Sequence, residues 1–73
     1  MHGIKRDDPV AKLARLGLTQ RIIRLLEDSE YGIISLRDLM KRRPEELLRL
    51  GNLGEKSVVA IVQCLARYQE LAA

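Results

Sequence analysis

The chain has 73 residues, of which 47% are hydrophobic, 32% charged and 3% aromatic, and its net charge is +3. This length suffices for one small domain and is too short for the core of a large enzyme. Its single cysteine, Cys64, cannot build a disulfide framework, and its longest apolar run, Val58 to Val62, is much shorter than the roughly 20 residues that cross a bilayer. We therefore expect a cytoplasmic protein that does not bind membranes.

The hydrophobic residues are nearly all Leu, Ile, Val and Ala, and the only aromatic residues are Tyr31 and Tyr68. Strands are enriched in aromatic and β-branched side chains, so this composition favours helices packed on helices. We predict an all-α fold, a compact bundle of four to five short helices.

The chain begins with a mostly polar stretch, residues 1–8, that has no hydrophobic period, so we expect a flexible tail or linker before a single helical domain over 9–73. Asp8 followed by Pro9 is typical of a helix start, because Asp accepts hydrogen bonds from free N–H groups and proline is tolerated in the first turn. The pair predicts a short helix from Pro9 to Leu16. Gly17 predicts its end, since glycine adopts the left-handed conformation that closes many helices.

A second helix is predicted after Thr19, whose hydroxyl can cap it. Its apolar stripe has helical spacing and consists of Leu18, Ile22, Leu25 and Leu26. Arg21 and Arg24 are three residues apart and therefore project close together beside the stripe. Three acidic residues end the segment, and we expect them to face away from the arginines: Glu27, Asp28 and Glu30.

Ser35 and Asp38 have the spacing of a capping box and predict a third, short helix. Pro44 predicts the start of a fourth helix, because proline is favoured in the first turn of a helix. We expect its leucines to pack, namely Leu47, Leu48 and Leu50. The last helix is predicted from about Glu55 to Leu71, with the buried stripe Val58, Ile61, Val62 and Leu65 and with Tyr68 or Gln69 next on that face.

The turn between the last two helices carries the most functional information, and it reads Leu50-Gly51-Asn52-Leu53-Gly54-Glu55-Lys56-Ser57. We expect Gly51, Asn52 and Gly54 to supply positive-φ positions and Leu53 to plug the underside of the turn. The helix that follows presents free N–H groups, and Lys56 and Ser57 add a charge and a hydroxyl, which together suit a phosphate. The alternative is a purely structural turn, which Glu55 favours because its carboxylate repels phosphate.

The string from Leu47 to Ile61 resembles a helix-hairpin-helix, a motif that grips the DNA backbone through the amides of its hairpin. Asn52 stands where that motif often has its first glycine, and asparagine tolerates the left-handed conformation. The bundle is thus expected to end in a helix-hairpin-helix whose second helix is the longer C-terminal one.

A further resemblance covers about Pro9 to Leu65. It rests on four segments in this order: Leu18-Thr19-Gln20-Arg21, Ile34-Ser35-Leu36-Arg37-Asp38-Leu39, Glu46-Leu47-Leu48-Arg49 and Asn52-Leu53-Gly54-Glu55-Lys56-Ser57. With them the protein resembles the C-terminal domain of the bacterial RNA polymerase alpha subunit. The resemblance implies a compact non-enzymatic module that binds AT-rich DNA through the minor groove and docks on transcription activators, sigma factor or other polymerase subunits in the bacterial cytoplasm.

The resemblance also implies DNA-binding roles for individual residues. Arg21 matches the arginine that enters the minor groove, and four residues match positions that touch the DNA backbone: Asn52, Gly54, Lys56 and Ser57. Arg49 matches a basic accessory position. Arg24 stands where the family usually has an asparagine in contact with DNA, so only phosphate contact is expected of it. Glu55 replaces a commonly basic residue, and Ala60 stands where an acidic residue is common.

The charges and the remaining residues agree with a binding module. Positive charge is concentrated in residues 1–26 and 35–49, and folding the hairpin against the Arg21 helix would gather it on one face. His2 and Cys64 cannot form a zinc site or a catalytic group with the other residues, so we expect no cofactor, metal, catalytic residue or small-molecule substrate. Two alternatives remain: a generic helix-hairpin-helix domain of a repair or recombination protein, and a helical protein-interaction domain with no role on DNA.

Overall fold

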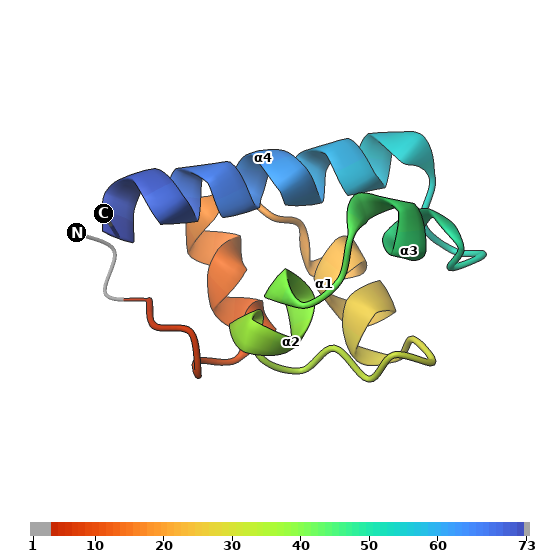
Figure 1. The fold of residues 1–73 in the computed structure, drawn as a ribbon, viewed down its shortest axis with the longest axis horizontal. Coiled ribbons are helices and arrows are strands. Elements are labelled where there is room, and N and C mark those ends of the chain that lie inside the picture. Colours follow the sequence, from red (N-terminus) through yellow and green to blue (C-terminus); the bar gives the residue numbers. More distant parts are fainter. Residues whose placement is uncertain (1–3, 73) are drawn as a thin grey trace.

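The computed structural model describes residues 4–72, and the expected tail residues 1–3, including His2, lie outside the described part. The described residues form five helices and no strand: η1 (Val10–Leu16, a 3-10 helix), α1 (Gln20–Glu27), α2 (Leu36–Met40), α3 (Pro44–Leu48) and α4 (Glu55–Ala72). Helix α4 runs along the whole molecule, and the shorter helices lie beneath it (Figure 1). The predicted all-α bundle is confirmed.

Three helix boundaries follow from local sequence as predicted. The Thr19 hydroxyl accepts a hydrogen bond from the Ile22 N–H (3.3 Å) and caps α1. The Ser35 hydroxyl accepts from the Asp38 N–H (3.1 Å), and the Asp38 carboxylate accepts from the Ser35 N–H (3.2 Å), which completes the capping box of α2. Gly17 ends η1 with a φ of 97°.

The prediction for Asp8 is wrong, because Pro9 occupies the cap position of η1 and that helix has no side-chain cap. The Asp8 carboxylate instead accepts from the Lys5 N–H (2.9 Å) and the Lys12 ammonium (3.2 Å). Both hydrogen bonds lower the pKa of the Asp8 carboxyl group, and the bond from the Lys5 backbone has the larger effect. Asp8 thus closes a turn in the segment before η1.

Residues 4–8, part of the expected tail, lie against the bundle. Ile4 is only 5% exposed and belongs to the core. The Leu36 N–H donates to the Asp8 carbonyl (2.9 Å) and the Arg37 N–H to the Arg6 carbonyl (2.8 Å), so this segment lies along the start of α2. These partners are about thirty residues apart in sequence, and local periodicity cannot indicate such pairing.

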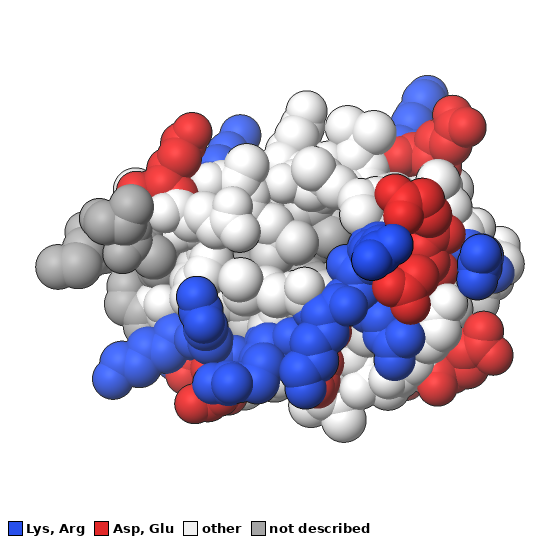
Figure 2. Space-filling view, viewed as in Figure 1, with Lys and Arg blue, Asp and Glu red and all other residues white. Residues whose placement is uncertain are grey.

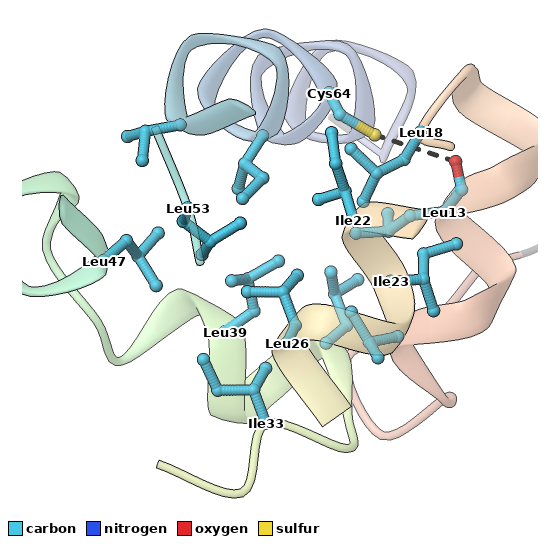
Figure 3. Packing of buried hydrophobic residues seen from close by; sticks show 14 of the residues in the cluster. Leu13, Leu18, Ile22, Ile23, Leu26, Ile33, Leu39, Leu47, Leu53 and Cys64 are labelled. Carbon is cyan, nitrogen blue, oxygen red and sulfur yellow. Dashed lines mark hydrogen bonds between the residues drawn. The ribbon is translucent and has the colours of Figure 1, made fainter. Parts of the chain in front are cut away.

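The core is a single aliphatic cluster to which every helix contributes (Figure 3). Leu13, Leu26, Leu39 and Ile61 are fully buried. Cys64 is buried as expected for a packing residue, its thiol donates to the Leu13 carbonyl (3.8 Å), and burial raises its pKa.

Two predicted core residues face solvent. Leu48 is 46% exposed and Val62 is 43% exposed. The buried face of α4 instead follows Val58, Ile61, Cys64 and Tyr68. Sequence periodicity allowed two neighbouring faces of this helix, and packing against η1 and α3 selects the one that contains Cys64.

Tyr31 connects the loop after α1 to α3. Its hydroxyl donates to the Glu46 carbonyl oxygen (3.1 Å), and the Arg42 guanidinium lies 4.1 Å from the centre of its ring. Arg42 also pairs with the Glu46 carboxylate (3.1 Å), while the Arg43 N–H donates to the same carboxylate. This link fixes the segment that leads into α3 and the hairpin.

Candidate nucleic-acid interface

The first part of the candidate site is the outer face of α1. Arg21 and Arg24 are both exposed, and helical spacing places them on the same side as Leu25 and Asp28. Neither arginine forms an ion pair with any residue that the structure describes. Both guanidinium groups are therefore available to an external anion.

The second part is the hairpin turn between α3 and α4. The Leu53 N–H donates to the Leu50 carbonyl (3.0 Å), and Leu53 is 4% exposed, so its expected role as a plug is confirmed. The Gly54 carbonyl accepts from the Val58 N–H (3.1 Å) and starts α4.

The expected positive-φ positions in this turn are wrong. Gly17 and Gly32 are the only glycines among the described residues with positive φ, and no other described residue has it. The turn is therefore built from ordinary backbone conformations. A Cβ at Gly51 or Gly54 would meet no atom within 4 Å, so both glycines border open space rather than packed protein.

A hollow of about 320 Å³ places these two parts side by side. From α1 and the loop after it come Leu25, Asp28, Ser29 and Glu30, and from the hairpin come Leu50, Gly51, Asn52 and Leu53. The sequence suggests the hairpin beside the Arg21 helix, but it does not place the loop residues after α1 in this hollow. The hollow also corrects one expectation: Asp28 and Glu30 do not face away but lie beside the hairpin.

The third part is the start of α4. Glu55 and Lys56 are exposed and Ser57 is half-buried. The first N–H groups of any α-helix have no partner within the helix, so this end offers donors and the positive end of a helix dipole. Arg49, the C-cap residue of α3, is exposed just before the hairpin. Neither Arg49 nor Lys56 is in an ion pair with a described residue.

Positive charge is not confined to this surface. On the face shown in Figure 2, basic side chains form a band over the N-terminal segment and α2. Part of this charge is compensated, since Arg37 pairs with Asp7 (2.9 Å) and Lys12 with Asp8 (3.2 Å). Basic side chains thus also gather over the N-terminal segment and α2, and not only beside the hairpin.

Neither a metal centre nor a membrane span is found in the part of the protein that the structure describes. No group of three or more His, Cys, Asp or Glu residues there could hold a metal ion. None of the helices within residues 4–72 is long and apolar enough to cross a bilayer.

A small helical bundle that ends in a hairpin and a longer helix, with the exposed basic residues Arg49 and Lys56 on either side of the hairpin, has the arrangement of a helix-hairpin-helix module. Residues 5–67 match the family of the C-terminal domain of the bacterial RNA polymerase alpha subunit, and the protein belongs to that family. Comparisons with curated proteins and with solved structures give no match. Family membership makes it a non-catalytic module of transcription that binds DNA and docks transcription factors.

Proposed function

We propose that α1, the hairpin and the start of α4 form one surface that binds AT-rich DNA through the minor groove and the phosphate backbone. The observation that carries this proposal is the hollow shared by Leu25 of α1 and residues 50–53 of the hairpin. It brings the helix that bears Arg21 and Arg24 beside the turn that leads to Lys56.

Arg21 is the residue that reads the sequence in this proposal. A-tracts have a narrow minor groove with enhanced negative potential, which attracts an inserted guanidinium. Arg21 is exposed in the first turn of α1 and has no ion-pair partner among the described residues, so insertion breaks no existing salt bridge. The preference for AT-rich DNA then arises from groove shape more than from hydrogen bonds to bases.

The hairpin side of the surface holds the phosphates. Asn52, Gly54, Lys56 and Ser57 contribute N–H, ammonium and hydroxyl donors there, and the open space at Gly54 lets a phosphate approach the backbone. Arg24 and Arg49 neutralise neighbouring phosphates.

The acidic residues limit this surface. Asp28 and Glu30 line the hollow, and Glu55 follows the hairpin, so phosphates are repelled from part of it. Few phosphates are neutralised, and the isolated domain binds DNA with a Kd of roughly 10⁻⁶ M or weaker. The module therefore acts beside a larger partner in the bacterial cytoplasm, with sigma factor, an activator or another polymerase subunit as that partner.

Fluorescence anisotropy with an A-tract duplex and a GC duplex, each at two salt concentrations, tests the proposal. We expect tighter binding to the A-tract, and Arg21→Ala should lose about 1–3 kcal/mol of binding free energy together with most of the AT preference. Lys56→Ala should weaken binding to both duplexes by the same factor. The matched control is Lys41→Ala, which removes an exposed, unpaired lysine at the end of α2 outside the hollow and should have little effect. An unchanged AT preference in Arg21→Ala would refute the minor-groove role.

Gly54→Ala separates DNA contact from folding. The added methyl group meets no protein atom within 4 Å, and Gly54 has no positive φ, so the melting temperature should not fall. Affinity for both duplexes should fall, because the methyl group occupies the space that a phosphate needs. Equal binding of both duplexes by the unmutated protein would favour the generic helix-hairpin-helix alternative, and binding of neither would favour the protein-interaction alternative.

A further inference from the structure

A second surface lies between α3 and α4, and we call it the α3–α4 groove. It is a recess of about 370 Å³ lined by Pro44, Leu48, Glu55, Val59, Val62 and Gln63, with the buried Val58 at its base. None of these residues lines the hollow beside α1. The groove therefore differs from the hollow, although Glu55 at the start of α4 borders both the groove and the proposed DNA surface.

The groove exposes apolar side chains that a small domain would be expected to bury. Leu48 is 46% exposed, Val59 is 53% exposed and Val62 is 43% exposed. Val59 and Val62 are three residues apart on α4 and meet Leu48 of α3 in one recess. Single exposed apolar residues are ordinary, but a contiguous recess of them is typical of a site where another protein docks.

The one charged residue among the described residues that line the groove is acidic. Glu55 lines the groove, and Glu45 follows Pro44 on the solvent side of α3. Neither carboxylate forms an ion pair with a residue in the described range. Figure 2 shows an uncharged area along α4, with acidic and basic side chains side by side toward both of its ends. An apolar centre with an acidic edge complements a ligand that is apolar in the middle and basic at its sides.

We propose that the α3–α4 groove docks an amphipathic helix of a partner protein, with apolar side chains in the recess and lysines or arginines beside Glu45 and Glu55. Such a helix presents apolar residues three and four positions apart, which is how helices bind apolar grooves. The proposal goes beyond the DNA surface, and it gives the docking activity of the family a location on this protein. Its validity does not depend on how the domain binds DNA.

A second copy of this protein fits the groove less well than a basic helix. A two-fold symmetric contact would place the recess against the same recess of the other copy, so neither would be filled. It would also bring four carboxylates, Glu45 and Glu55 of each copy, toward one interface. We therefore expect the isolated domain to remain monomeric.

Two synthetic helical peptides test the proposal, one of leucine and lysine and one of leucine and glutamate with the same leucine spacing. The whole protein has a net charge of +3, so long-range electrostatics favours the glutamate peptide. We expect the opposite preference in an amide-resolved NMR titration, with the lysine peptide shifting Leu48, Val59 and Gln63. Preference for the glutamate peptide, shifts outside the groove, or concentration-dependent shifts on α4 without peptide would each overturn the proposal.

Variants that keep the charge locate the contact. Val62→Ser should weaken binding of the lysine peptide about tenfold, which is the effect of losing one buried side chain of valine size from the interface. Leu71→Ser is the matched control, because Leu71 is 46% exposed on the same helix outside the groove, and it should bind as the unmutated protein does. Equal weakening by both variants would refute the site.

Melting curves and DNA anisotropy of the same variants complete the test. We expect Val62→Ser to melt like Leu71→Ser and to bind the A-tract duplex unchanged. Loss of peptide binding with DNA binding intact shows that the two surfaces work separately. Failure of the DNA proposal would appear in the Arg21 variant and would leave the peptide result unaffected.

Discussion

Replacing Ile4 by alanine tests whether the segment before η1 is part of the folded core. The Ile4 side chain is 5% exposed, and the substitution removes three carbon groups from it. At about 0.8 kcal/mol for each buried methylene, the transfer contribution is about 2.4 kcal/mol. The cavity left behind adds to this, and relaxation of the backbone near its end reduces it, so we expect a loss of about 2–3 kcal/mol in the free energy of unfolding.

This loss is large for so small a domain. At roughly 0.05–0.15 kcal/mol per residue, the whole protein is stable by about 4–11 kcal/mol. Each kcal/mol lowers the melting temperature of a domain of this size by about 4–8 °C, so Ile4→Ala should melt about 8–24 °C lower. Circular dichroism of the helical signal during heating and during urea titration measures both quantities.

Ile34→Ala is the control for this experiment. Ile34 is 62% exposed, and its carbonyl group, which accepts a hydrogen bond from the Val10 N–H (2.7 Å), is retained in the variant. A substitution at such a surface position changes stability by less than about 0.5 kcal/mol. If Ile4→Ala destabilises the protein no more than Ile34→Ala, the packing of residues 4–8 on the bundle is refuted.

Three further predictions concern single bonds and turns. Gly17→Ala should destabilise the domain by about 1 kcal/mol or more, because the φ of Gly17 is 97°. Gly51→Ala should be neutral or stabilising by up to about 1 kcal/mol, because Gly51 has no positive φ and an added Cβ would meet no atom within 4 Å. Urea titration of both variants measures the difference. Tyr31→Phe removes the hydrogen bond from the hydroxyl to the Glu46 carbonyl of α3 and should lower the free energy of unfolding by about 0.5–1.5 kcal/mol, which urea titration also measures. The hydrogen bond from the Ser35 backbone N–H lowers the pKa of the Asp38 carboxyl group from its ordinary 3.8. The ionised carboxylate therefore stabilises the fold fully above pH 3.8, and this stabilisation is lost as the pH falls through the lowered pKa. Melting from pH 7 to pH 2 should accordingly show a smaller loss of stability on acidification in Asp38→Asn.

Features encoded by neighbouring residues could be predicted from sequence. The cap at Thr19, the box at Ser35 and the stop at Gly17 each depend on a few consecutive residues, and the structure confirms all three. The burial of Leu53 in the hairpin could be predicted for the same reason, since Leu53 is the one apolar residue between the closely spaced Gly51 and Gly54.

Features that depend on distant residues could not be predicted. The docking of Ile4 needs the start of α2, and the exposure of Val62 depends on which face of α4 meets η1. The hollow that Asp28 and Glu30 share with the hairpin likewise joins segments far apart in the sequence. The seven DNA-binding residues inferred from the family resemblance remain predictions, and Arg21 is the one whose variant tests them most directly.

The direction of α4 determines how the domain can be attached to anything else. Near its C-terminal end, the Arg67 guanidinium donates to the Leu16 carbonyl (3.0 Å) at the end of η1. The segment before η1 and the last turn of α4 lie toward one end of a molecule 34 Å long, and the hairpin lies at the other (Figure 1). The first and the last described residues therefore both lie at the end opposite the hairpin, so a label or polypeptide attached beyond them starts far from it.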